Sequence, residues 1–101
     1  MARHTEAMER VAEAILGTPG DVDPELRRAV EAVAAGREAE LPDDLRPYVE
    51  KVARNAYKVV DADIDRLQDA GYSDDAIFEL TLAAALGAAQ TRLGAGLRAM
   101  R

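Results

Sequence analysis

Apolar residues recur at helical spacing along most of this chain. The stretch from Thr5 to Leu16 carries them at the i, i+3, i+4, i+7 and i+8 positions of one helix face. This spacing predicts an amphipathic helix, with Thr5 as its N-cap. A second helix is predicted to begin with Asp23 as N-cap and Pro24 at its first position. Gly36 is expected to end it, because glycine adopts the left-handed conformation that follows many helices.

The second half of the chain predicts three more helices. A charged connection over residues 36–46 leads to Pro47, which suits the first turn of the third helix. Asp61 is the expected N-cap of the fourth helix and Gly71 its terminator, while Ser73 is the expected N-cap of the fifth. Nothing in the sequence alternates as a strand does. We therefore predict one all-α domain over residues 1–101, with about five helices.

The fifth predicted helix is apolar on nearly every side. It extends towards the C-terminus unless Gly94 or Gly96 bends or breaks it, since each glycine costs about 1 kcal/mol relative to alanine. Such a helix is buried on most sides, and four short helices cannot easily surround it. We expect a second copy of the chain to pack against it; the alternative is a central helix packed on small partners within one chain. The residues expected to allow close approach of the second copy are Ala83, Ala84, Gly87 and Ala88.

Composition narrows the classes of function. The net charge of −6 argues against binding to nucleic acid or to anionic membranes, because both are held mainly through cationic side chains. The absence of cysteine excludes disulfides, thiolate catalysis and zinc–thiolate sites within one chain. The first residues lack the apolar stretch of a signal peptide, and residues 82–89 are too few to span a bilayer, which takes about 20. We expect a cytoplasmic protein.

The segment over residues 59–81, which reads VVDADIDRLQDAGYSDDAIFELT, resembles the carboxymuconolactone decarboxylase and alkylhydroperoxidase-D-like superfamily. Those proteins carry a short helix, an Ala-Gly-(Leu/Tyr)-Ser-(Asp/Glu) turn and a helix that begins with Ile-x-Glu-Leu. The later run QTRLGAGL is similar to their last helix, so the resemblance covers roughly residues 48–101. It implies an all-helical bundle of the alkylhydroperoxidase-D-like type, which assembles as dimers, trimers or hexamers. Because the long C-terminal helix is expected to be buried on most sides, we place it at the interface of such a homo-oligomer.

The resemblance does not extend to the peroxidase chemistry of this superfamily. That chemistry uses Cys-x-x-Cys followed by histidine, and counting back from the Gly71 turn places Ala56, Val59 and Asp63 at those positions. Our leading hypothesis is a non-redox, non-catalytic member that serves as an assembly or small-ligand-binding module. The alternative is a cofactor-independent lyase or decarboxylase that uses acid–base residues. A third hypothesis is a chain that partners a longer, cysteine-bearing protein of the same fold.

Glu79 is the sharpest candidate for such acid–base chemistry. It lies in the second turn of the apolar helix, where burial would raise its pKa and suit it to proton transfer. The alternative is a structural ion pair with an arginine or lysine from another helix or subunit. Tyr57 and Lys58 would supply a phenol and an ammonium group near a pocket. The alternative is that Tyr57 packs at a helix end and Lys58 faces solvent. For Asn55 and Arg92, a role near a pocket and a purely structural role both remain open.

Metal ligands are sparse. His4 is the only histidine and precedes the expected start of the first helix. Asp61, Asp63 and Asp65 are spaced as oxygen ligands, but the central glycine and distal glutamate of a calcium-binding loop are missing. Helix capping and a solvated face explain these carboxylates better. We therefore predict no metal and no cofactor, and the catalytic residues are unknown.

Overall fold

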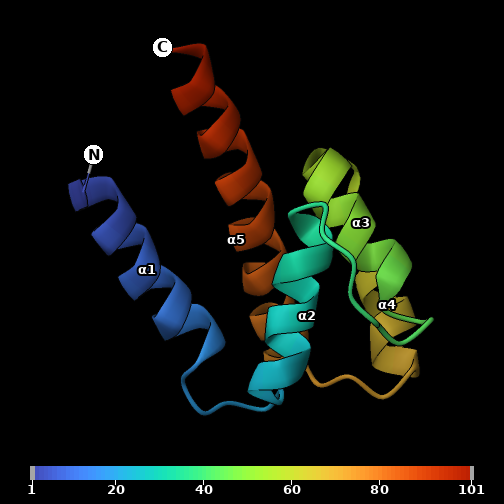
Figure 1. The fold of residues 1–101 in the computed structure, drawn as a ribbon. Coiled ribbons are helices and arrows are strands. Elements are labelled where there is room, and N and C mark those ends of the chain that lie inside the picture. The colour runs from blue at the N-terminus through green and yellow to red at the C-terminus, as the bar shows by residue number, and fades with distance from the viewer. Residues whose placement is uncertain (1, 101) are drawn as a thin grey trace.

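The computed structural model describes residues 2–100 of the chain, and the side chains of residues 6–100. Its elements are α1 (Ala2–Leu16), α2 (Pro24–Ala34), α3 (Arg46–Asn55), the 3-10 turn η1 (Ala56–Lys58), α4 (Asp61–Asp69) and α5 (Asp74–Ala99). Residues 2–100 contain no strand, which confirms the all-α class and the five helices. In Figure 1, α2 lies across the lower half of α5, with α3 and α4 to one side and α1 to the other.

Two of the predicted N-caps are confirmed. The Asp23 carboxylate accepts a hydrogen bond from the Glu25 N–H at 2.8 Å, and the Ser73 hydroxyl accepts one from the Ala76 N–H at 3.0 Å. Each cap satisfies one of the amide groups that a first helical turn leaves without an internal partner. Asp23 thereby starts α2 and Ser73 starts α5, where the sequence predicts.

Both predicted glycine terminators are also confirmed. Gly36 and Gly71 have φ angles of 86° and 104°, in the left-handed region that side chains disfavour. After each glycine the chain bonds back onto the last helical turn: the Arg37 N–H donates to the Ala32 carbonyl at 2.8 Å, and the Tyr72 N–H to the Leu67 carbonyl at 3.1 Å. These bonds satisfy carbonyl groups that the helix ends would otherwise leave open.

Two helix starts differ from prediction. Helix α1 already includes Thr5, so Thr5 is not its N-cap. Helix α4 has Val60 at the N-cap position and Asp61 as its first residue. The capping contact comes instead from Asp63, whose carboxylate accepts a hydrogen bond from the Val60 N–H at 2.9 Å. A carboxylate in the third helical position can bond back to the first free amide, which makes Asp61 unnecessary as a cap.

Helix α5 is the centre of the fold. Its 26 residues continue through both late glycines without a break. Leu80, Ala83 and Ala84 are fully buried, against a core to which α2 and α3 contribute Val30, Val49 and neighbouring apolar side chains. Loop residue Leu45 is buried in the same core. Because α2 and α3 cover one side of α5, the helix needs no second chain on that side.

The small residues of α5 therefore have a different role from the predicted one. A Cβ atom placed on Gly87 would overlap the Glu31 carbonyl oxygen and lie 2.9 Å from the Ala34 Cβ. The close approach of backbones thus occurs between α5 and α2 of the same chain. Ala83, Ala84, Gly87 and Ala88 are all buried within the single chain, so the expectation that these four residues face a second copy is wrong. No helix within residues 2–100 has the length and apolarity needed to cross a membrane.

Candidate functional site

Glu79 holds the connection between α1 and α2. Its carboxylate accepts hydrogen bonds from the Asp21 N–H at 2.9 Å and the Val22 N–H at 3.0 Å. A Cβ atom on Gly20 would lie 2.6 Å from the Glu79 Oε1, so this loop lies directly on the carboxylate. Arg27 is 2% exposed and donates to the carbonyls of Ile15, at 2.7 Å, and of Thr18. Arg27 therefore links the end of α1 to α2, and Glu79 links the loop between these two helices to α5.

The surroundings of Glu79 lower its pKa. Desolvation acts to raise the pKa of this carboxyl group, but the amides of Asp21 and Val22 and the positive charge of Arg27 outweigh it. The predicted rise is therefore wrong, because backbone amides stabilise the charged form. The main partners of Glu79 are also backbone groups rather than the predicted ionic side chain. A carboxylate held ionised in this way is a poor proton donor near neutral pH.

The other candidates lie around the C-terminal end of α3. Tyr57 is 82% exposed, and the Lys58 Nζ lies 5.8 Å from its ring centre. Asn55 is the last residue of α3. Arg92 donates through Nη2 to the Ala53 carbonyl at 3.0 Å, which ties α5 to α3. The His4 side chain lies outside the described residues.

The three aspartates of α4 do not converge on a common point. Asp61 and Asp65 are exposed, whereas Asp63 is 7% exposed. The Asp63 Oδ2 accepts from the Lys51 Nζ at 2.8 Å, and its Oδ1 lies 3.6 Å from the Arg66 Nη1. The Lys51 hydrogen bond is the main reason that the pKa of Asp63 is lowered. Within the described residues, no group of three or more histidine or acidic side chains is placed to hold a metal ion.

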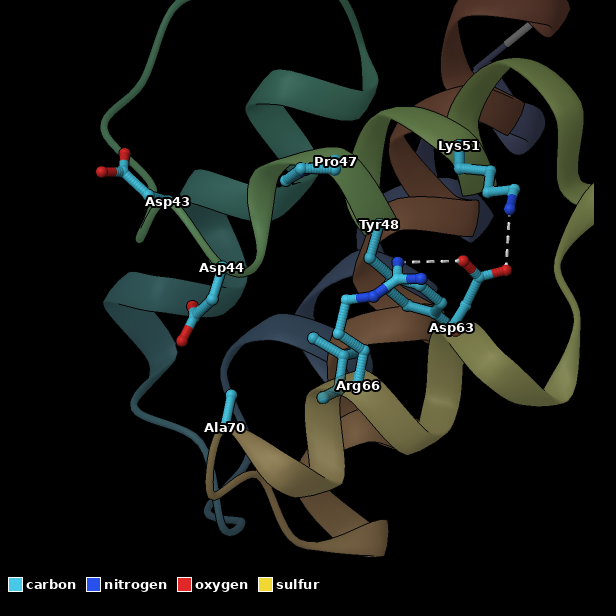
Figure 2. A pocket seen from close by; sticks show the side chains of 9 residues that line it. Asp43, Asp44, Pro47, Tyr48, Lys51, Asp63, Arg66 and Ala70 are labelled. Atoms are coloured by element: carbon cyan, nitrogen blue, oxygen red, sulfur yellow. Dashed lines mark hydrogen bonds and ion pairs between the residues drawn. The ribbon is translucent and has the colours of Figure 1, made fainter.

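Asp63 belongs to the wall of a cavity of about 380 Å³, which we name the α3–α4 pocket. Figure 2 shows Asp43 and Asp44 on one side of this pocket and Lys51, Asp63 and Arg66 on the other. Its wall is formed by nine residues: Asp43, Asp44, Pro47, Tyr48, Lys51, Asp63, Arg66, Leu67 and Ala70. One end of the wall thus carries two aspartates and the other carries two cations with the Asp63 carboxylate, and the remaining lining residues are Pro47, Tyr48, Leu67 and Ala70.

Two tyrosine hydroxyls form hydrogen bonds that connect the wall of the α3–α4 pocket to neighbouring elements. The Tyr72 hydroxyl donates to the Asp44 Oδ1 at 2.9 Å, and burial together with this carboxylate raises the pKa of Tyr72 to about 12. The Tyr48 hydroxyl and the Thr81 Oγ1 are 2.8 Å apart. These contacts join the start of α3 to the turn before α5 and to α5 itself. The wall of the pocket is therefore tied to the core of the fold.

Sequence reasoning missed the α3–α4 pocket. One signal was present: Asp63, Arg66, Leu67 and Ala70 follow the i, i+3, i+4, i+7 spacing of a single helix face. A face that mixes charged with apolar residues is typical of a pocket wall as well as of a surface. Only the packing of α3 beside α4 distinguishes the two cases, and the local pattern does not contain that information.

A second unusual surface runs along α5. Phe78, Leu82, Leu93 and Met100 are 63%, 37%, 40% and 83% exposed. The intervening exposed residues of the same face are small, and we name the whole set the α5 outer face: Phe78, Leu82, Ala85, Ala89, Leu93, Gly96 and Met100. Steps of three and four residues keep all seven on one side of the helix. This side is distinct from the Gly87 side that packs on α2.

Comparisons of the chain with protein-family models, with curated proteins and with solved structures found no match. The resemblance to the carboxymuconolactone decarboxylase and alkylhydroperoxidase-D-like superfamily therefore stays a prediction.

Proposed function

We propose that this protein is a non-redox assembly module of the carboxymuconolactone decarboxylase-like type, which pairs with a second copy of itself through the α5 outer face. The observation that carries the proposal is the exposed apolar stripe along the longest helix. Of the exposed large hydrophobic side chains in the described part of the chain, four lie on this face; the other three, Val11, Tyr57 and Val60, are on other elements. Monomers rarely expose a contiguous apolar patch of more than a few hundred Å².

The order of residues on the face favours an antiparallel pair. A pairing centred between Leu82 and Ala85 brings Phe78 of each copy against Ala89 of the other, and Leu82 against Ala85. Large side chains then meet small ones, which permits close packing. Asp74 and Arg92 lie on the same edge of the face, about five turns apart. Antiparallel pairing therefore places each Asp74 near the Arg92 of the other copy, so that the charges are complementary.

A twofold pair of this kind is the simplest closed assembly, because one surface serves both copies. It also adds apolar burial to a chain whose sequence is rich in alanine and has 4% aromatic residues. Larger oligomers are compatible with the proposal if they contain this pair. The lyase alternative has less support, because its acid–base candidate Glu79 is occupied by the Asp21 and Val22 amides.

Sedimentation velocity at micromolar concentration tests the proposal with two matched variants. Ala85→Glu places a charge on the α5 outer face, and Ala95→Glu places the same charge at an exposed position on another side of the same helix. We expect the wild type and Ala95→Glu to sediment as oligomers and Ala85→Glu as a monomer, with unchanged helical circular dichroism in all three. A monomeric wild type, or dissociation by Ala95→Glu alone, would refute the proposal.

The orientation of the pair is testable because the chain contains no cysteine. Two single-cysteine variants, Phe78→Cys and Ala89→Cys, are mixed in equal amounts and oxidised. An antiparallel pair brings the two different cysteines together, so a disulfide between the two variants should form faster than a disulfide within either variant alone. If each variant instead crosslinks fastest with itself, the helices run parallel and the proposed pairing is wrong.

A further inference from the structure

We propose that the α3–α4 pocket binds a small zwitterion, a molecule that carries an ammonium group and a carboxylate separated by a short apolar stretch. This inference goes beyond self-assembly, since it concerns a cavity that contains no residue of the α5 outer face. It rests on the charges at the two ends of the pocket, on the wall between them and on the size of the cavity.

The end formed by Lys51, Asp63 and Arg66 has an excess of positive charge. Among the lining residues at that end Asp63 is the one carboxylate, and it pairs with both Lys51 and Arg66. Its Oδ2 also accepts the Val60 N–H, so little of its acceptor capacity remains for a ligand. The cations keep spare donors, because an ammonium has three N–H groups and a guanidinium has five. Their side chains are 32% and 74% exposed, respectively, and therefore accessible to a ligand carboxylate.

The end formed by Asp43 and Asp44 has the opposite character. Both residues are exposed, and no cationic side chain within residues 6–100 forms an ion pair with either of them. The Asp44 Oδ1 accepts the Tyr72 hydroxyl, which orients this carboxylate without neutralising it. The two aspartates make this end of the pocket negative, and a ligand ammonium supplies the opposite charge with three donors.

The apolar wall and the volume limit the ligand to a small molecule. Leu67 and Tyr48 are 2% and 7% exposed, and with Pro47 and Ala70 they supply the uncharged surface of the pocket. The cavity volume of about 380 Å³ falls at the lower end of the range for small-molecule sites. A simple anion would use only the Lys51 end and a simple amine only the Asp43 end. A zwitterion of amino-acid size uses both ends.

The test is a ¹⁵N-HSQC titration of the wild-type protein with four probes at low ionic strength. Two are zwitterions of different length, 4-aminobutanoate and 6-aminohexanoate, and two are single-charge analogues, butanoate and butylamine. We expect at least one zwitterion to bind at millimolar concentration, with shifts at the amides of the pocket residues. Each single-charge analogue should bind at least about threefold more weakly, in line with the loss of one exposed ion pair.

Matched variants connect binding to the two ends. Asp43→Asn and Arg66→Gln each remove one charge from the pocket, while Asp69→Asn removes a charge from an exposed position of α4 outside it. We expect each pocket variant to weaken zwitterion binding about threefold and Asp69→Asn to leave it unchanged. The inference is overturned if neither zwitterion shifts the pocket amides, if butanoate or butylamine binds as tightly as the better zwitterion, or if Asp69→Asn weakens binding as much as Asp43→Asn. The Ala85→Glu variant should bind as the wild type does, so a failure here is separate from a failure of the proposed assembly.

Discussion

The contact between α5 and α2 makes a sharp prediction for Gly87→Ala. In an ordinary helix interior this replacement stabilises, because alanine is favoured over glycine by about 1 kcal/mol. At Gly87 the added methyl group meets backbone rather than flexible side chain: it overlaps the Glu31 carbonyl oxygen and lies 3.0 Å from the Ala35 nitrogen. Helix α2 would have to move away from α5, and that movement would loosen the packing of the core.

The expected magnitude follows from two opposing contributions. Overpacking a well-filled core costs about 1–3 kcal/mol, and the upper part of this range applies because the obstacle is backbone. The gain in helix propensity of about 1 kcal/mol offsets part of it. We therefore expect Gly87→Ala to lower the free energy of unfolding by about 1–2 kcal/mol. For a domain of this size, each kcal/mol shifts the Tm by about 4–8 °C.

Thermal and urea unfolding, followed by circular dichroism at 222 nm, measure this change. The matched control is Gly94→Ala in the same helix, where the nearest atom to the new methyl group is the flexible Arg98 Nη1 at 3.4 Å. The control should be as stable as the wild type or up to about 1 kcal/mol more stable. If Gly87→Ala melts at or above the wild-type temperature, the close packing of α5 on α2 is wrong.

Three further predictions concern Glu79, Tyr72 and Gly36. Glu79→Gln should destabilise the protein at neutral pH, and in urea titrations the difference in stability between variant and wild type should shrink as the pH falls. The reason is that folding lowers the pKa of Glu79: the stability that this carboxylate contributes is complete above the unfolded-state pKa and is lost as the pH falls through the folded-state pKa. In an ultraviolet titration of the tyrosines, Tyr72→Phe should remove a component with a pKa of about 12; an unchanged curve would contradict the Asp44 contact. Gly36→Ala should lower the free energy of unfolding by about 1–2 kcal/mol, measured by thermal unfolding. Backbone strain at the φ of 86° is the expected cause, since the new methyl group meets no atom within 4 Å and therefore causes no clash.

Local chemistry explains which parts of the fold were predictable. The caps at Asp23 and Ser73 and the stops at Gly36 and Gly71 each depend on residues within a few positions of one another. Such features are visible in a linear sequence because the hydrogen bonds that they satisfy are local. The predicted start of α4 differs from the observed one by one residue, because Asp61 and Asp63 both qualify as local caps and the sequence does not distinguish them.

The sites depend on contacts that are distant in the sequence. Glu79 lies 58 positions from Asp21, and that contact reverses the expected direction of its pKa shift. The α3–α4 pocket forms only because Lys51 and Asp63 come from two helices that pack side by side. No spacing rule predicts such encounters, because they are set by how the helices share the core.

Taken alone, the sequence determined an all-helical chain with a long, mainly apolar last helix, since periodicity, caps and glycine stops are properties of short segments. Which side of that helix is covered depends on how α2 and α3 pack against it. Gly87 and its small neighbours lie against α2, whereas Phe78, Leu82 and Leu93 are left exposed. A helix that is apolar all round gives no preference for one face over another, so only the placement of α2 and α3 could separate its packing side from its exposed side.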